Sequence, residues 1–336
     1  MKPKLLIMEL WGLGDLVIAT PFLRAAAERF DVTLVAKPYA LDLQQRLWPG
    51  VRVRPFVAPW TAFKGKYRLW RWPWLDAFRL LRELSRAKFD VALSARWDPR
   101  DHILLALSGA ATRLGFSRLR SEIFLTRNLR RPDLRGHRYE YWRALGRELG
   151  LSVPEREAIP VTPNGSHHAI LVHTGAGQPI RVWPLERYRL LVQQLRADGF
   201  TVLLACDPDQ RDWWRQAGEP EVQTPETVAQ LLALVDRAGV FVGNDSGPGH
   251  LAAACGLPTF TVFGPQLPEW FAPLHPRAEW VEGEACPYKP CSDYCRFDRP
   301  RCMTELGAEL VIGRLRYFLR NLSPPAPEKN PAGAVI

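Results

Sequence analysis

The chain of 336 residues lacks any apolar run of membrane-spanning length, because arginine or lysine interrupts every candidate stretch. Its first residues, Met-Lys-Pro-Lys-Leu-Leu-Ile-Met, also lack the hydrophobic core and small-residue cleavage site of a secretory signal. They are typical of a buried strand, and we expect a cytoplasmic protein. No internal repeat is present. The length favours two domains, and a hydrophobic fraction of 47% is ample for folded cores.

Acidic residues are scarce in the first half of the chain. Residues 1–160 hold 29 lysines and arginines against 16 acidic residues, whereas residues 161–336 hold 16 against 19. Arginine predominates in the basic half, as is usual where planar phosphate or carboxylate groups are recognised. A generic basic surface is the simpler explanation, but the asymmetry favours an anionic partner for the first half.

Patterns typical of strands alternate with patterns typical of helices in both halves. The first half has expected strands at 4–9, 32–36 and 89–94 and expected helices at 16–29 and 75–86. The second half has expected strands at 169–173, 201–205, 240–242 and 259–263 and expected helices at 185–198, 225–236 and 304–320. This alternation predicts two Rossmann-like, parallel-sheet α/β domains that face a central cleft.

Prolines and glycines cluster at 154–165 with little periodicity, which indicates a linker. We therefore place a first domain at 1–160 and a second domain at 161–322. The remaining Pro-rich tail, 323–336, is expected to be disordered.

The segment 241–265 has the pattern of a strand, a polar turn, a short helix, a Gly-Pro break and a second strand. Pro248 suits the first helical position, where its missing N–H is not needed. Ser246 and Gly247 then leave backbone N–H groups uncovered at a helix N-terminus, a geometry that attracts phosphate.

Asp245 and His250 flank the same turn. Because a carboxylate repels phosphate, we expect Asp245 to face the neutral, hydroxyl-rich part of a ligand. The turn therefore predicts a pocket for a phosphate joined to a polyol.

Gly12-Leu-Gly14-Asp15 follows the first expected strand and opens the first expected helix. The third glycine of a dinucleotide fingerprint is absent, since position 17 is valine, so the pattern is weak evidence for NAD binding. The glycines still allow close approach of a ligand, and Asp15 lies at the carboxyl end of a strand, facing the cleft. A helix cap is an equally good interpretation of Asp15, and the two roles are compatible.

His173-Thr-Gly175-Ala-Gly177 ends the first strand of the second half, and Arg181 follows on the next loop. Small residues with one cation suit a diphosphate, because backbone donors and the arginine share its charge. A flexible loop with a surface arginine is the alternative.

Asp207-Pro-Asp209 matches an Asp-x-Asp pattern with which some enzymes hold a divalent cation. We favour a helix cap, because Asp207 follows a strand and precedes a proline. One of the two carboxylates also suits a nucleotide ribose at a strand end.

Aromatic and cationic side chains alternate in one segment of the first half. They are Trp60, Phe63, Lys64, Lys66, Tyr67, Arg68, Trp70, Arg71, Trp72 and Trp74. Such a segment suits a membrane interface or an acceptor, and single-stranded nucleic acid would also fit it. A loop whose rings fold back onto the domain is the simpler alternative.

Four of the six cysteines, Cys286, Cys291, Cys295 and Cys302, lie within 17 residues. In a cytoplasmic chain this clustering suggests a metal more than disulfides, although the paired Cys-x-x-Cys spacing of zinc sites is absent. Metal binding and reduced thiols or labile disulfides are comparably good interpretations. Four thiolates would leave no open coordination position, so a metal here would be structural.

With these motifs in place, the chain resembles the heptosyltransferases, glycosyltransferase family nine, which have the two-domain GT-B fold. The resemblance covers nearly the whole chain. It rests on Gly14-Asp15 with Thr20-Pro21-Phe22-Leu23-Arg24, on Gly175-Ala-Gly177 with Trp183-Pro184, and on Asp245-Ser-Gly247 with His250-Leu-Ala-Ala-Ala and Phe263-Gly-Pro265. The cysteine-rich segment ending in Cys302-Met303 is also similar to a stretch in some relatives.

The resemblance implies an inverting, metal-independent transfer of a heptose or similar sugar from a nucleotide-diphosphate donor such as ADP-heptose. The implied acceptor is a lipopolysaccharide core or another anionic, lipid-linked glycan at the inner face of the inner membrane. No cofactor is then required for catalysis, and nucleic acid is not an expected partner.

The resemblance also assigns roles to residues. Asp15 falls on the family's proposed catalytic base, and Arg181 falls where the family commonly has a phosphate-binding lysine. Asp245, Ser246, Gly247 and His250 fall on the donor site, with Gly175 and Gly177 nearby, whereas Gly14, Trp70 and Arg71 belong to the acceptor-binding first domain.

Two other functions stay open at this point. One is a nucleotide-sugar epimerase or hydrolase of the same fold. The other is a non-catalytic module that binds glycan or nucleic acid through the Trp- and Arg-rich segment. A pure binding module has little need of a diphosphate pocket with a carboxylate opposite, and the cleft motifs argue against it.

Overall fold

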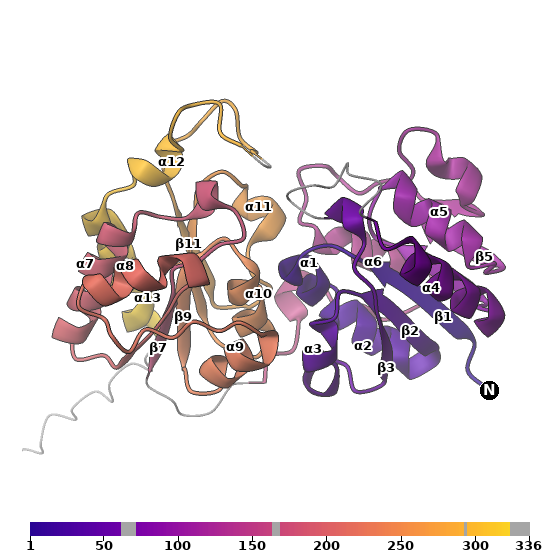
Figure 1. Ribbon diagram of the computed structural model, residues 1–336, viewed down its shortest axis with the longest axis horizontal. Helices are drawn as coiled ribbons and strands as arrows, with labels where there is room; N and C mark the ends of the chain where they lie inside the picture. The colour runs from indigo at the N-terminus through magenta and orange to yellow at the C-terminus, as the bar shows by residue number, and fades with distance from the viewer. Residues whose placement is uncertain (62–71, 163–168, 292–293, 323–336) are drawn as a thin grey trace, which may run out of the picture.

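The computed structural model describes residues 1–61, 72–162, 169–291 and 294–322. Figure 1 shows two α/β domains side by side, each built on one sheet. All paired strands within the named elements are parallel, which confirms the predicted fold class. The tail 323–336 lies outside the described residues, as does the end of the predicted linker, residues 163–165.

The first domain has a six-stranded sheet in the order β3-β2-β1-β4-β5-β6. Its central strand β1 runs through consecutive fully buried residues from Leu5 to Met8, as expected for a parallel strand covered on both faces. The elements are β1 (Lys4–Glu9), α1 (Leu13–Ile18), α2 (Thr20–Arg29), β2 (Asp31–Ala36), α3 (Ala40–Leu47), β3 (Val51–Pro55), η1 (Pro59–Thr61), α4 (Trp74–Ala87), β4 (Val91–Ser94), α5 (Pro99–Leu107), β5 (Thr112–Gly115), η3 (Ser121–Phe124), β6 (Arg127–Asn128) and α6 (Tyr139–Glu148).

The second domain follows the short helix η4 (Arg156–Ala158) and has a five-stranded sheet in the order β11-β10-β9-β7-β8. Strands and helices alternate along it, and α13 returns to pack beside α7. The elements are β7 (Ile170–His173), η5 (Pro179–Arg181), α7 (Leu185–Ala197), β8 (Val202–Ala205), η6 (Pro208–Gln210), α8 (Arg211–Gln216), α9 (Val228–Val235), β9 (Val240–Asn244), α10 (Gly247–Ala254), β10 (Thr259–Phe263), α11 (Pro268–Phe271), β11 (Ala278–Glu282), α12 (Arg301–Thr304) and α13 (Ala308–Leu322).

Two predicted helices are wrong as single elements. The helix predicted at 16–29 is two helices, α1 and α2, which meet at Ala19. Pro21 explains the break, because it has no N–H to donate and sits in the first turn of α2, where that loss is tolerated. The helix predicted at 304–320 is likewise preceded by the separate turn α12, and α13 begins only after Gly307.

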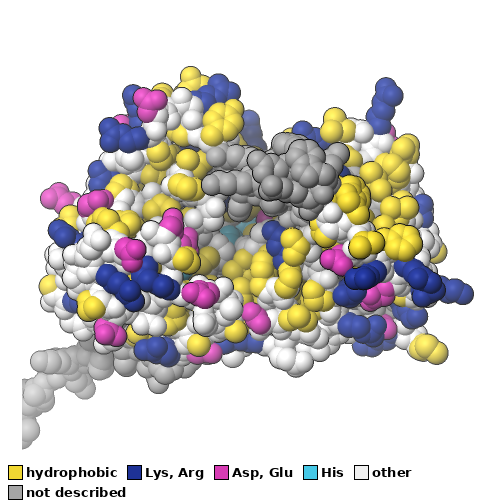
Figure 2. All heavy atoms as spheres, viewed as in Figure 1, with side chains coloured by type: hydrophobic (Ala, Val, Ile, Leu, Met, Phe, Trp, Pro, Cys, Tyr) yellow, Lys and Arg dark blue, Asp and Glu magenta, His cyan; other side chains and the backbone are white. Residues whose placement is uncertain are grey.

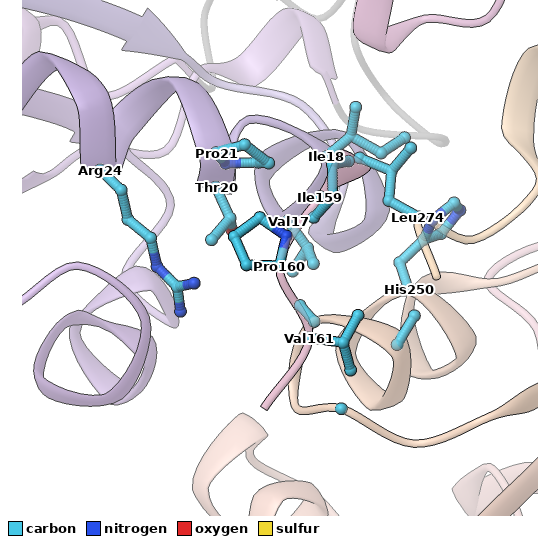
Figure 3. A pocket seen from close by; sticks show the side chains of 13 residues that line it. Val17, Ile18, Thr20, Pro21, Arg24, Ile159, Pro160, Val161, His250 and Leu274 are labelled. Atoms are coloured by element: carbon cyan, nitrogen blue, oxygen red, sulfur yellow. The ribbon is translucent and has the colours of Figure 1, made fainter. Parts of the chain in front are cut away.

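The two domains touch mainly through α1 and α10. Behind this contact lies a mostly apolar pocket in which the linker residues Ile159, Pro160 and Val161 meet both domains. Figure 3 shows Val17 and Ile18 from the first domain on one side of it, with Leu274 and His250 from the second domain on the other. Among the described residues, no helix combines the length and the apolar character that crossing a membrane requires.

Candidate active site

Each sheet has one point where the strand order reverses, and both points face the same cleft. In the first sheet β1 lies between β2 and β4, so the loops that follow β1 and β4 diverge there. In the second sheet β7 lies between β8 and β9, and the loops that follow β7 and β9 diverge in the same way. Ligands of open α/β sheets bind at such points.

The cleft between these two edges encloses about 1870 Å³, its open mouth included. Figure 2 shows the hollow between the two domains. The first domain lines it with Trp11, Gly12, Leu13, Gly14, Asp15, Lys37, Trp60, Thr61, Arg96, Arg100 and Arg138, and the second with Gly177, Gln178, Arg181, Asp245, Ser246, Gly247, Pro248, His250, Gln266, Trp270, Phe271 and Pro290.

Asp15 is both a helix cap and a cleft residue. Its Oδ2 accepts a hydrogen bond from the Gly12 N–H at 3.3 Å, which closes the first turn of α1. Its Oδ1 forms an ion pair with Arg96, which comes from the loop after β4. Asp15 is therefore a helix cap and a cleft residue at once. One of its carboxylate oxygens is held by a backbone N–H group and the other by Arg96.

Glu9 lies behind this ion pair, at the end of β1. Its side chain is only 2% exposed, accepts a hydrogen bond from the Trp11 N–H at 3.2 Å, and lies 4.0 Å from the Nε of Arg96. Burial raises the pKa of the Glu9 carboxyl to about 8, against the lowering effect of the Arg96 charge. Glu9 is therefore mostly uncharged at neutral pH, and Arg96 is balanced by Asp15.

Glycines let the two walls approach closely. A Cβ on Gly14 would lie 2.7 Å from the His250 ring, and one on Gly247 would lie 2.9 Å from Leu13. Only glycine allows α1 and α10 to come this near without displacement. His250 is buried in this contact, and burial lowers its pKa to about 4, so its imidazole is neutral in the closed arrangement.

The N-terminus of α10 faces the cleft as the sequence predicts. Among the described residues, no acceptor pairs with the backbone N–H groups of Ser246 and Gly247. The Ser246 hydroxyl does not cap the helix; it donates to the Asn244 carbonyl at 3.2 Å. Two free N–H donors and the positive end of an eight-residue helix thus point to where an anion would bind.

Arg181 and Asp245 meet on the same wall. The Nη1 of Arg181 donates to the Asp245 Oδ2 at 3.3 Å, and the Asp245 side chain is 4% exposed. Burial raises the pKa of the Asp245 carboxyl to about 6, while Arg181 opposes the rise. Arg181 keeps its Nε without a hydrogen-bond partner. Arg181 also lines the cleft, where a charge-assisted hydrogen bond to an anionic ligand is possible.

Asp207 differs from its predicted role. It occupies the N-cap position of η6, but its side chain makes no capping hydrogen bond. The carboxylate instead lies 4.0 Å from the His173 ring and packs over Gly175, where a Cβ would come within 2.1 Å of it. The Asp207 side chain thus contacts the end of β7 instead of capping η6. This packing requires glycine at position 175.

The predicted Trp- and Arg-rich segment lies mostly outside the described residues. Trp70 and Arg71 fall there, together with most of the Trp- and Arg-rich segment. Of its described members, Trp60 is buried and lines the cleft, and Trp72 packs between the rings of Trp60 and Trp74.

The cysteine cluster forms no disulfide, and all four thiols are free. Within the described ranges, no three histidine, cysteine or acidic side chains are close enough together to hold a metal ion. Burial raises the pKa of the Cys302 thiol to about 11, so this group stays protonated at neutral pH.

Sequence reasoning missed Glu9, Arg96 and Arg138. Arg96 follows a strand that was predicted, but it carries no motif of its own. The signal lay in topology: once β4 is placed beside β1, the residue after β4 must stand next to the loop that carries Asp15. Glu9 closes a strand whose pattern gives no warning of a buried acid.

Two parallel-sheet domains whose reversal points face one cleft make up the GT-B architecture of sugar-transferring enzymes. Within that class, the chain belongs to glycosyltransferase family 9 (heptosyltransferase), whose model matches residues 77–299. The family predicted from the sequence motifs is therefore confirmed.

Individual relatives are similar over different spans. The chain is 32% identical to lipopolysaccharide heptosyltransferase 3 of Escherichia coli over 107 residues, which is 28% of this chain and 31% of that protein. It thus spans about a third of the length of the heptosyltransferases 2 and 3 that it matches. The lipopolysaccharide core heptosyltransferase OpsX of Haemophilus influenzae is 22% identical over 93% of this chain and 96% of its own.

Among solved structures, the E. coli heptosyltransferase WaaC with ADP has a TM-score of 0.72 at 18% identity. The match covers 94% of this chain and 99% of WaaC. At this identity the likeness confirms the fold.

Proposed function

We propose that this protein is an inverting glycosyltransferase that moves a heptose or related sugar from a nucleotide-diphosphate donor to a lipopolysaccharide-core or similar anionic glycan. One observation carries the proposal. A carboxylate, Asp15, stands on one wall of the cleft, and an arginine with a helix N-terminus, Arg181 and α10, stands on the opposite wall. Family membership, and relatives named for heptosyl transfer, support the same reaction.

The donor occupies the second domain in this proposal. Its diphosphate lies at the α10 N-terminus, where the N–H groups of Ser246 and Gly247 and the guanidinium of Arg181 share the charge. Asp245, buried beside Arg181, holds sugar hydroxyls. The solved relative with ADP supports an adenosine diphosphate donor such as ADP-heptose.

Transfer then needs one proton movement and one bond exchange. The acceptor hydroxyl gives its proton to Asp15, and its oxygen attacks the anomeric carbon from the face opposite the diphosphate. The bond from that carbon to the diphosphate oxygen breaks, and the negative charge collects on the leaving group. Arg181 and the α10 N–H groups stabilise that charge, so we propose that no divalent cation is needed.

Nucleotide binding tests the donor assignment. A thermal-shift screen of ADP-, GDP- and UDP-sugars should show a rise in Tm with an ADP-sugar, and Arg181→Gln should weaken ADP binding about tenfold or more because a charge-assisted contact is lost. Arg118→Gln, an exposed arginine outside the cleft, is the matched control. An ADP dissociation constant left unchanged by Arg181→Gln contradicts the diphosphate site.

The screen, together with an assay of donor consumption without acceptor, separates the alternative functions. An epimerase or hydrolase would consume the donor without an acceptor, whereas a glycan- or nucleic-acid-binding module would respond to no nucleotide. We favour transfer because the cleft places a carboxylate against a diphosphate site, which neither alternative explains as well.

We further propose that the first domain contacts the inner face of the inner membrane. Helix α4 exposes Trp74, 56% accessible, together with Leu75 and Phe78. Near η3, Leu119 is 78% exposed and adopts a left-handed backbone, as does Arg120. Figure 2 shows hydrophobic and basic side chains interspersed over this domain, a combination that suits an anionic lipid surface. Flotation with anionic and zwitterionic vesicles tests it, and equal recovery with both would contradict it.

We also propose that the four clustered cysteines bind a structural metal. Metal analysis of protein purified under reducing conditions tests it, with stoichiometric metal expected if the thiols rearrange into one site. A protein free of metal after growth in iron and zinc would contradict it.

A further inference from the structure

Two helices from different domains, α3 and α9, lie side by side at the domain boundary. Figure 1 shows them facing each other at the lower edge of this boundary, below α1 and α10. Their apolar sides belong to one buried cluster, which includes Leu43 of α3 and Val235 of α9. Among the described residues that line the cleft, none belongs to either helix, so this contact is separate from the proposed site.

The charged ends of the two helices match. Asp42, in the first turn of α3, accepts a hydrogen bond at 3.2 Å from the Ala229 N–H in the first turn of α9. Arg46, in the last turn of α3, forms an ion pair with Asp236, the residue at the C-cap of α9. The helices therefore run in the same direction, and each end of α9 meets a side chain of the first domain.

Asp236 lies at an end of α9 that disfavours a carboxylate. The C-terminus of a helix carries a partial negative charge, so an acidic side chain there costs stability whereas a basic one adds to it. In α9, which the structure describes in full, the last turn holds no basic residue to offset this cost. Arg46 of the other domain offsets it, and this compensation lasts only while the domains stay together. Asp42 adds to it at the other end, because its carboxylate meets the positive N-terminus of α9.

Both helices are connected through their neighbouring strands to the walls of the cleft. α3 follows β2, and β2 pairs with β1, whose end leads into the loop that carries Asp15. α9 leads into β9, whose end leads into the turn with Asp245 and Ser246. Because each domain is close-packed, a movement of α9 away from α3 also changes the separation of Asp15 from the donor wall.

We propose that Asp42 and Arg46 are positioning residues, which hold α9 against α3 and thereby set the separation between the Asp15 wall and the donor wall of the cleft. They act through the domains that they join and not through contact with a substrate. The proposal rests on the proposed function for the reaction that the two walls perform, whereas the arrangement of the domains is tested without any sugar transfer.

Asp236→Lys separates this role from a purely structural one. The new lysine suits the C-terminus of α9, so the second domain keeps its fold, but across the boundary it repels Arg46. Small-angle X-ray scattering, extrapolated to zero protein concentration, should therefore show a larger radius of gyration than in wild type. The kcat of sugar transfer should fall about threefold to tenfold. The dissociation constant of ADP should be unchanged, because the proposed diphosphate site lies on one domain.

The charge swap of Arg46→Glu with Asp236→Lys should restore the attraction. Both the radius of gyration and kcat should return to the wild-type values, kcat to within about twofold. Asp198→Lys is the matched control, because Asp198 lies at the C-cap of α7 and pairs with Arg316 of α13 at 2.6 Å, inside the second domain. This control breaks the same kind of contact and should change neither the radius of gyration nor kcat.

Salt provides an independent test. The Arg46 side chain is 31% exposed and that of Asp236 is 50% exposed, so dissolved ions screen the interaction between them. Raising NaCl from about 0.05 M to about 0.5 M should increase the radius of gyration of wild type, because an attraction is screened. The same change should decrease that of Asp236→Lys, because a repulsion is screened. A response of the same sign in both proteins contradicts the positioning role.

Failure of this proposal can be told apart from failure of the proposed function. If wild type transfers no sugar, but Asp236→Lys enlarges the radius of gyration and the swap reverses the change, the positioning role is kept and the reaction is contradicted. If wild type transfers sugar and Asp236→Lys equals it in kcat and in radius of gyration, the reaction is kept and the positioning role is overturned. A loss of kcat that the swap does not recover overturns it as well.

Discussion

At the scale of single residues, the first-domain wall of the site is organised by one ion pair and by one buried acid behind it. Asp15 is held between the Gly12 N–H and Arg96, and Glu9 lies behind them in its neutral form. A free carboxylate would change rotamers, whereas one held from both sides keeps a single orientation, as the proposed base would require.

Glu9 should make the protein less stable as pH rises. Its pKa is about 8 in the folded state against an ordinary 4.5, so the folded state binds the extra proton and stability falls from pH 4.5 to 8. Glu9→Gln should therefore stabilise the protein at pH 8, on the order of 3 kcal/mol, and hardly at all at pH 4.5. Urea unfolding at both pH values measures this. A variant that gains equally at both would contradict the buried neutral acid.

At the scale of elements, the sequence pattern predicted the individual strands better than it predicted the contacts between elements. The strands 4–9 and 259–263 match β1 and β10, because continuous apolar runs allow few other interpretations. The break between α1 and α2 was missed although Pro21 signals it, because the apolar periodicity continues across Ala19.

The partner of Asp15 was also missed. Arg96 meets it only through the pairing of β1 with β4, which lie more than 80 residues apart and which no local pattern joins. By contrast, the turn before α10 with its uncovered N–H groups could be predicted, because glycine, proline and serine at a helix start have a local meaning.

The contact of α1 with α10 should be sensitive to a single methyl group. Gly14→Ala places a Cβ 2.7 Å from the His250 ring, which must move, and we expect a loss of about 1–3 kcal/mol. Gly313→Ala is the matched control, because this glycine lies within α13 with no atom within 4 Å of the new Cβ. It should stabilise by about 0.5–1 kcal/mol. Chemical denaturation compares the two, and equal effects would refute the close packing.

At the scale of the whole molecule, neutral histidines help to join the two domains. The Nε2 of His137, in the first domain, bonds the Ala272 carbonyl of the second at 2.9 Å. Burial lowers the pKa of His137 to about 3 and that of His250 to about 4. Arg46 and Asp236 form an ion pair across the same boundary. Both histidines are therefore neutral at the boundary between the domains, and their protonation would weaken the contact between the domains.

Acid should open this boundary. A histidine whose folded pKa is depressed contributes stability above its unfolded pKa of 6.5 and loses it as pH falls toward the folded value. From pH 7 to 5, His137→Gln should lose less stability than wild type, by about 2 kcal/mol. Unfolding curves at the two pH values measure the difference. Identical losses would show that His137 does not titrate on unfolding.

We propose above all that Asp15 takes the acceptor proton while the donor is bound on the opposite wall of the cleft. The most direct measurement is steady-state sugar transfer by Asp15→Asn, with the dissociation constant of ADP determined on the same preparation. Asparagine keeps the shape of the side chain and removes the base. We predict a fall in kcat of about 10²–10⁴-fold with ADP affinity unchanged. Turnover close to that of the wild type would contradict the account.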